Sequence, residues 1–195
     1  MGAMLLGVAL TVVLVSLAGP PPPKTVVHET VWFKAGRAAP GLRLTEDVAG
    51  YCSGPARSTP RDDAWRCFAD EHWIDPCFSA TARSRTVLCP TDPWSKNVRL
   101  VELTRKLPPL VARRGRADAP WGIWTENAKQ CVIAVSGAAL TLGGRRVRYE
   151  CAVSGFLVGY ADARGRTWTI GYVPRFELGK PNIHARPIGI TDVWR

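Results

Sequence analysis

Six cysteines are the residues with the clearest chemistry in this chain, because their number and position indicate disulfide bonds. They all follow an apolar leader, residues 1–19, and they are Cys52, Cys67, Cys77, Cys89, Cys131 and Cys151. An even set of thiols behind an export signal is typical of disulfides formed outside the cytosol. No two cysteines have the C-x₂₋₄-C spacing of zinc ligands, so we predict neither a metal site nor a cofactor.

Six cysteines allow 15 pairings, and the sequence offers only proximity as a guide. Sequential pairing joins Cys52 to Cys67, Cys77 to Cys89 and Cys131 to Cys151. Each of these bonds closes a short loop and contributes about 3 kcal/mol in the chain-entropy model. We therefore expect three local crosslinks.

A candidate for catalysis is the acidic segment 62–75, DDAWRCFADEHWID, in an otherwise basic chain. His72 with Asp70 or Asp75 would suit a hydrolase, in which a histidine moves a proton and a carboxylate orients it. The alternative is structural, since Asp62 and Asp63 suit a helix start and Asp75-Pro76 suits a turn. No nucleophile-elbow or metalloprotease motif is present, so we predict a protein that is not an enzyme.

Tryptophan and arginine point instead to binding. The chain has eight tryptophans and a net charge of +10. Trp121 and Trp124 could stack on a sugar, although tryptophans also enlarge small cores. Arg145, Arg146 and Arg148 form a basic strand that would attract an anionic cell-wall polymer or glycan. The alternative is that these charges are simply solvated, and we expect no nucleic acid because an exported protein rarely meets it.

The segment between Cys77 and Cys89, CFSATARSRTVLC, suggests a second kind of partner. Arg83 and Arg85 lie in its middle and would suit a protease that cleaves after basic residues. The alternative function is therefore a protein-binding module, either a protease inhibitor or a membrane-anchored accessory subunit of an envelope complex.

The leader divides the chain into three parts. Residues 1–19 carry no charge and form a signal peptide or a membrane anchor, because their length lies between the two classes. Ser16 and Ala18 favour cleavage after Ala18, whereas the lack of a preceding Lys or Arg does not. Residues 20–24 form a Pro-rich spacer, and residues 25–195 form one exported β domain. The predicted location is extracytoplasmic, either secreted or held at the cell membrane through residues 1–19.

Most of the remaining segments read as strands, because they are rich in β-branched and aromatic residues and are bounded by turn formers. They are residues 25–33, 41–44, 86–89, 98–103, 121–124, 131–135, 138–142, 145–153, 156–160 and 167–173. Gly143 and Gly144 suit a two-residue hairpin turn. Thr59, Pro60 and Asp62 suit the start of one short helix ahead of residues 63–71. We therefore expect a mainly β fold, an antiparallel sandwich or barrel with one short helix, crosslinked by disulfides.

The last cysteine pair requires an interruption in its hairpin. A regular hairpin around Gly143 and Gly144 places Cys151 opposite Ser136 rather than opposite Cys131. Either Cys131 belongs to a third strand, or Ser136 and Gly137 break the strand. We predict the break, because a Ser-Gly step is a typical interruption.

Several short motifs together carry a family resemblance. They are AWRC at 64–67, DPCF at 75–78, VLCPTDPW at 87–94, RRVRYEC at 145–151 and the closing DVW at 192–194. In this order they resemble a family of small secreted disulfide-containing bacterial proteins of the actinobacterial type, for which no activity is established. The resemblance covers residues 52–194 and implies an exported, disulfide-bonded domain without catalytic residues. The CPTDP and GRRVRYE elements are also similar to secreted subtilisin inhibitors, without their cysteine spacing.

Overall fold

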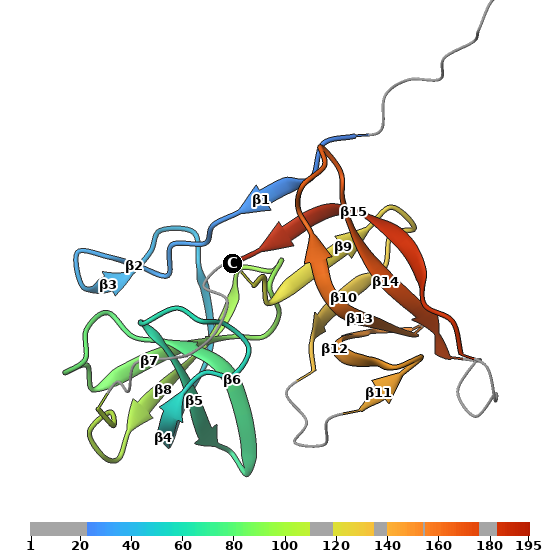
Figure 1. Cartoon of the computed structure of the whole chain (residues 1–195). Coiled ribbons are helices and arrows are strands. Elements are labelled where there is room, and N and C mark those ends of the chain that lie inside the picture. Colours follow the sequence, from blue (N-terminus) through green and yellow to red (C-terminus); the bar gives the residue numbers. More distant parts are fainter. Residues whose placement is uncertain (1–22, 110–118, 135–139, 154, 176–182) are drawn as a thin grey trace, which may run out of the picture.

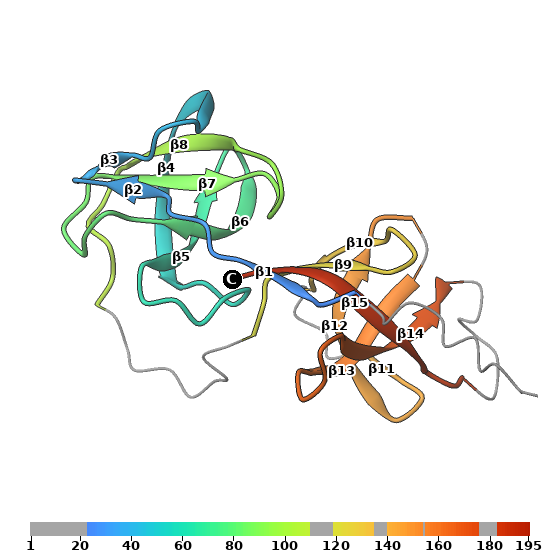
Figure 2. The same ribbon diagram turned by 90° about the horizontal axis from the view of Figure 1, so that it is seen from above.

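The computed structural model describes residues 23–109, 119–134, 140–153, 155–175 and 183–195. The fold is mainly β and consists of two closed sheets that lie side by side (Figures 1 and 2). The leader and the first three prolines of the spacer lie outside the described residues. None of the described residues belongs to a helix with the length and apolar character needed to span a membrane.

The first barrel is a five-stranded meander. Its strands are β4 (Arg43–Pro55), β5 (Ala64–Ala69), β6 (His72–Phe78), β7 (Thr86–Pro90) and β8 (Asn97–Leu103). Because each strand reverses the chain direction, the first and the fifth run parallel where β4 and β8 close the barrel. The long strand β4 pairs first with β8 and then with β5, and both pairings meet at Gly50. An added Cβ there would lie 2.6 Å from the carbonyl oxygen of Phe68, so the crossing requires glycine.

The expected helix over residues 63–71 is wrong, because this segment forms β5 and the turn into β6. Trp65, Cys67 and Ala69 are buried, whereas Arg66 and Phe68 between them are only half-buried. This alternation has the period of a strand. Asp70 and Glu71 form the two-residue turn, with φ angles of 50° and 63°. The helix prediction was based on the start signal at Thr59, Pro60 and Asp62, and pairing of β5 with strands on both sides overrides it. No α-helix is present in the described parts of the chain.

The second barrel is a ring of six strands. They are β9 (Gly122–Thr125), β10 (Gln130–Ile133), β12 (Arg145–Cys151), β13 (Gly155–Asp162), β14 (Trp168–Pro174) and β15 (Arg186–Trp194). An even number of strands, with an odd number of reversals between the first and the last, makes the closing pair, β15 and β9, antiparallel. The short strand β11 (Thr141–Leu142) also pairs with β12 and forms the predicted hairpin, with φ angles of 54° and 72° at Gly143 and Gly144.

The described chain begins against the second barrel. Strand β1 (Val26–His28) runs parallel to the end of β15, and the hairpin of β2 (Phe33–Lys34) and β3 (Arg37–Ala38) follows. His28 stacks on Trp194 with ring centroids 4.6 Å apart, and its Nε2 lies 2.8 Å from a carboxylate oxygen of Asp192. The predicted single strand over residues 25–33 is therefore two short strands.

All three disulfides follow the predicted sequential pairing. Each joins neighbouring antiparallel strands, and Cys52–Cys67 and Cys131–Cys151 are register partners. Cys131 lies on β10, which is separate from β11, and these two strands pair with different parts of β12. Ser136 and Gly137 themselves lie outside the described residues. Three disulfides indicate an oxidising, extracytoplasmic environment.

Six aromatic residues pack between the barrels, and we call them the inter-barrel aromatic cluster. They are Trp32, Phe78, Trp94, Trp121, Trp124 and Trp194. Trp32 stacks on Phe78 of the first barrel at 5.0 Å and meets Trp121 of the second at 6.4 Å. The two barrels therefore share one part of their apolar core.

Candidate functional site

The two tryptophans predicted to bind a sugar lie in the inter-barrel aromatic cluster. Trp121 is 5% exposed, and Trp32 and Phe78 both contact its ring. Trp124 is partly buried against Trp94 and Trp194. These positions correspond to the alternative role, in which tryptophan enlarges the core.

The predicted basic strand has the expected two faces. Val147, Tyr149 and Cys151 are buried, whereas Arg145 and Arg146 are exposed. Arg148 is half-buried, with its guanidinium 3.9 Å from the ring centroid of Tyr160 and hydrogen-bonded to the hydroxyl of that residue. The two outer arginines remain accessible to an anionic partner.

Arg83 and Arg85 are exposed in the loop that connects β6 and β7, at whose base lies the Cys77–Cys89 disulfide. The loop is compact, because the Thr81 amide donates to the Ser84 hydroxyl and the Arg83 amide donates to the Thr81 hydroxyl. The two arginines are thus presented on a short, crosslinked turn.

The structure does not bring the predicted histidine and carboxylates into contact. Asp75 accepts hydrogen bonds from the backbone amides of Arg57 and Ser58 and from the Ser58 hydroxyl. Asp70 lies 3.8 Å from Arg99. Among the residues that the structure describes, no hydrogen bond joins His72 to either carboxylate.

A different group of residues gathers on the outer surface of the first barrel, and we call it the aromatic–arginine cluster. It consists of Tyr51 on β4, Arg66 and Phe68 on β5, Trp73 on β6 and Arg105 just after β8. The pleat dictates this placement, since residues that alternate with the buried cysteines must point outward. Tyr51 pairs with Phe68 and Phe68 pairs with Trp73, so the three rings lie across three neighbouring strands.

The three rings contact one another. Ring centroids lie 5.7 Å apart for Tyr51 and Phe68, 5.2 Å for Phe68 and Trp73, and 6.3 Å for Tyr51 and Trp73. Trp73 is 47% exposed, whereas Tyr51 and Phe68 are half-buried beside it. Phe68 thus lies between the other two rings, and Trp73 is the ring most open to solvent.

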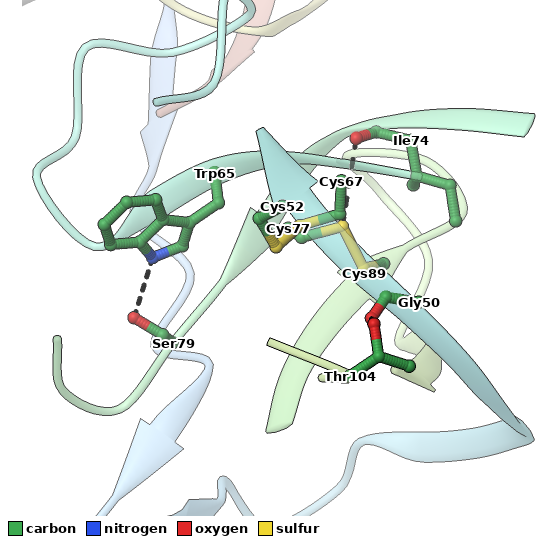
Figure 3. The surroundings of a disulfide bond; sticks show 9 residues. All are labelled: Gly50, Cys52, Trp65, Cys67, Ile74, Cys77, Ser79, Cys89 and Thr104. Carbon is green, nitrogen blue, oxygen red and sulfur yellow. Dashed lines mark hydrogen bonds between the residues drawn. A yellow bond between two sulfur atoms is a disulfide. The ribbon is translucent and has the colours of Figure 1, made fainter. Parts of the chain in front are cut away.

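Two guanidinium groups lie on these rings. Arg66 lies 4.2 Å from the ring centroid of Trp73, and Arg105 lies 3.6 Å from that of Tyr51. Thr104 fixes the second arginine, because its amide and hydroxyl both donate to the carbonyl oxygen of Gly50, at 2.8 and 2.9 Å (Figure 3). Stacking orients a guanidinium and leaves its N–H edge free to donate.

Neither arginine side chain of this cluster forms an ion pair or a hydrogen bond within the described residues. By contrast, Arg61, Arg164, Arg175 and Arg195 all pair with carboxylates. Two oriented, uncompensated guanidiniums suit a carboxylate, sulfate or phosphate group, to which arginine donates two parallel hydrogen bonds.

A second basic feature lies at the opposite end of β4. Arg43 and Lys96, with Gly41, Ser95 and Asn97, line an open hollow of about 350 Å³. The Arg43 amide donates to the Lys96 carbonyl, which holds the two cationic residues together. This hollow offers further positive charge on the same barrel.

No pattern in the sequence indicated the aromatic–arginine cluster directly. Its members come from four separate segments and form no motif, so only the strand register reveals that they meet. The available signal was the alternation in AWRCFA, which places Arg66 and Phe68 on the face opposite the cysteine once the segment is read as a strand.

No protein-family model matches this chain, and no curated protein or solved structure is significantly similar to it. The resemblance to small secreted bacterial proteins therefore stays a prediction.

Proposed function

We propose that this protein is an exported, non-enzymatic domain that binds an anionic polymer or glycan at the cell surface. The observation that supports this most strongly is the pair of stacked arginines, Arg66 and Arg105, on the outer aromatic rings of the first barrel. The leader at residues 1–19 would deliver the domain across the membrane, either as a cleaved signal peptide or as a retained anchor in contact with the membrane.

Anionic ligands fit the cluster better than neutral sugars do. A neutral sugar stacks on an open ring face, but Trp73 and Tyr51 each have a guanidinium over one face of the ring. A ligand that approaches there meets N–H donors, which bind carboxylate, sulfate or phosphate groups in a planar geometry. The ring rims can still contact the apolar parts of an acidic sugar.

The net charge supports the same partner. A charge of +10 raises the rate of encounter with a polyanion. Arg43 and Lys96 in the hollow, and Arg145 and Arg146 on the second barrel, would add weaker contacts along a long polymer. Such contacts strengthen binding because a polymer engages several sites at once.

The experiment compares two double variants of equal charge. Arg66→Gln with Arg105→Gln removes the stacked pair, and Arg83→Gln with Arg85→Gln removes two exposed arginines elsewhere. Binding to a purified acidic wall polysaccharide is measured at low and at high ionic strength. We expect the first variant to bind at least about 100-fold more weakly, since each charge-assisted hydrogen bond contributes about 1.5–3 kcal/mol and each arginine loses at least one.

The control variant should lose only the small amount that two distant charges contribute, and binding of both should weaken with salt. Equal losses in the two variants would show that charge alone drives binding and would refute the site. Undiminished binding of the first variant would refute it as well.

A second candidate function is inhibition of a protease specific for basic residues. The exposed Arg83 and Arg85 on a turn closed by the Cys77–Cys89 disulfide favour this reading. We expect sustained inhibition of trypsin with the loop intact, and loss of inhibition in the Arg83→Gln, Arg85→Gln variant. Rapid cleavage of the loop would exclude this function.

A further inference from the structure

Four of the six cysteines converge in the core of the first barrel. Each comes from a different strand: Cys52 from β4, Cys67 from β5, Cys77 from β6 and Cys89 from β7. Figure 3 shows the two disulfides lying next to each other, with Trp65 to one side. The convergence arises because the cysteines all occupy inward-facing positions of consecutive strands.

The sulfur positions are close enough for one ion to reach several of them. The Sγ atoms of Cys67, Cys77 and Cys89 all lie within 4.8 Å of one another. Cys52 is bonded to Cys67, so its sulfur borders the same group. In a tetrahedral site with metal–sulfur bonds of about 2.3 Å, the sulfurs lie about 3.8 Å apart. Once the disulfides are reduced, small side-chain movements would bring the thiolates to that separation.

The surroundings favour a thiophilic ion. All four cysteines are at most 4% exposed, and their neighbours include Trp65, Val87 and Val101. An apolar shell excludes water and carboxylates, which are the ligands that magnesium and calcium require. Thiolates in such a place select zinc or copper(I). The wide spacing in the sequence, which argued against zinc, does not limit a site assembled from four strands.

We propose that the reduced first barrel binds one thiophilic metal ion through Cys67, Cys77 and Cys89, with Cys52 as the fourth ligand. A dithiol reductant supplies two electrons and two protons to each disulfide and is itself oxidised to a disulfide. A zinc ion then displaces one proton from each thiol that it binds. The proposal is independent of anion binding on the outer surface.

The site would allow one barrel to be crosslinked in two ways. In the oxidised protein, Cys52–Cys67 and Cys77–Cys89 hold the strands together. In the reduced protein, the ion would join the same four strands, because metal binding to a preorganised site contributes directly to folding stability.

The test uses the full chain, reduced without oxygen by a phosphine and titrated with cobalt(II) as a spectroscopic probe. We expect one equivalent to bind, with thiolate-to-cobalt charge-transfer bands and the visible bands of a tetrahedral site. Zinc should then displace the cobalt and remove both sets of bands. Absence of these bands in the reduced protein would overturn the proposal.

Two double variants separate this site from non-specific thiol binding. Cys77→Ser with Cys89→Ser should weaken cobalt binding more than about 100-fold, which exceeds the usual effect of changing only outer-shell residues. Cys131→Ser with Cys151→Ser removes the same number of thiols from the second barrel and should leave binding unchanged. Equal effects of the two variants would overturn the proposal.

If the reduced chain unfolds without metal, the tryptophan fluorescence of the folded protein reports the outcome. Its recovery when zinc is added would support the site, and its absence after zinc addition would overturn it.

Discussion

Gly122 of β9 offers the most direct test of the contact between the two barrels. A Cβ added at this position would lie 2.3 Å from Cγ and 2.4 Å from Cβ of Pro93, in the β7–β8 loop of the first barrel. Carbon atoms in contact are normally about 3.5–4.0 Å apart, so the barrels would have to separate locally by about 1.2 Å. The buried proline ring has no rotamer that moves it aside.

The expected cost of Gly122→Ala follows from these distances. Inserting a carbon into a packed core costs about 1–3 kcal/mol. Alanine also lowers the conformational entropy of the unfolded chain, which stabilises the folded state by about 0.4–1 kcal/mol. We therefore expect the free energy of unfolding to fall by about 1–2 kcal/mol and Tm to fall by about 2–8 °C for a chain of this size.

Urea unfolding followed by tryptophan fluorescence is a suitable assay, because five of the eight tryptophans lie in the inter-barrel aromatic cluster. Gly54→Ala is the matched control, since nothing lies within 4 Å of a Cβ added there. Its stability should stay within about 0.5 kcal/mol of the original protein.

A double-mutant cycle then identifies the partner. Pro93→Gly removes both atoms that the new Cβ would meet, so Gly122→Ala should cost less in that background, with a coupling energy of at least about 0.5 kcal/mol. A neutral Gly122→Ala variant, or an equal cost in both backgrounds, would refute this contact between the barrels.

Three further predictions concern separate parts of the fold. Replacing Cys131 and Cys151 by serine opens a crosslink with a sequence separation of 20 residues, which should lower the free energy of unfolding by about 3.3 kcal/mol in urea denaturation. Asp75→Ala leaves three donors of the β4–β5 loop without their acceptor and should cost about 1–3 kcal/mol in the same assay, with no change in m if the barrel stays intact. The hydrogen bonds from Arg164 lower the pKa of Asp162 from 3.8 to about 2, so the pair stabilises the fold above the ordinary pKa and loses this contribution as the pH falls towards 2. A carboxyl titration by NMR should give a midpoint near 2, and a higher midpoint in Arg164→Ala, which loses the side-chain hydrogen bonds and keeps the one from the backbone amide. An unchanged midpoint in the variant would contradict the assignment.

The second barrel was easier to predict from the sequence than the first. Between Arg145 and Cys151 the alternation of apolar and charged residues predicted both faces of β12, and the two glycines before it predicted the turn. The mainly β class and the sequential disulfides followed from strand-like composition and from proximity.

Strands of the first barrel could not be predicted where their residues also suited a turn or a helix. Strand β6 contains Asp75-Pro76, which reads as a turn, and Asp70 and Glu71 are non-glycine residues with positive φ angles. Asp62 and Asp63 before β5 suited a helix start, and a helix was therefore predicted although the alternation of residues in AWRCFA is typical of a strand. The closing strand β15, beginning at Arg186, was missed because Pro187 and Gly189 are typical of loops; here both lie opposite residues of β14.

The pleat of β4, β5 and β6 links the two proposals made above, because inward and outward residues alternate along these strands. Tyr51 adjoins Cys52, and Arg66 and Phe68 lie on either side of Cys67. The outer rings and guanidinium are therefore attached to backbone that a buried disulfide restrains on the other face. A binding surface on restrained backbone loses less conformational entropy when a ligand arrives. The cysteines thus give the aromatic–arginine cluster a rigid base, which a surface of the same composition on a free loop would lack.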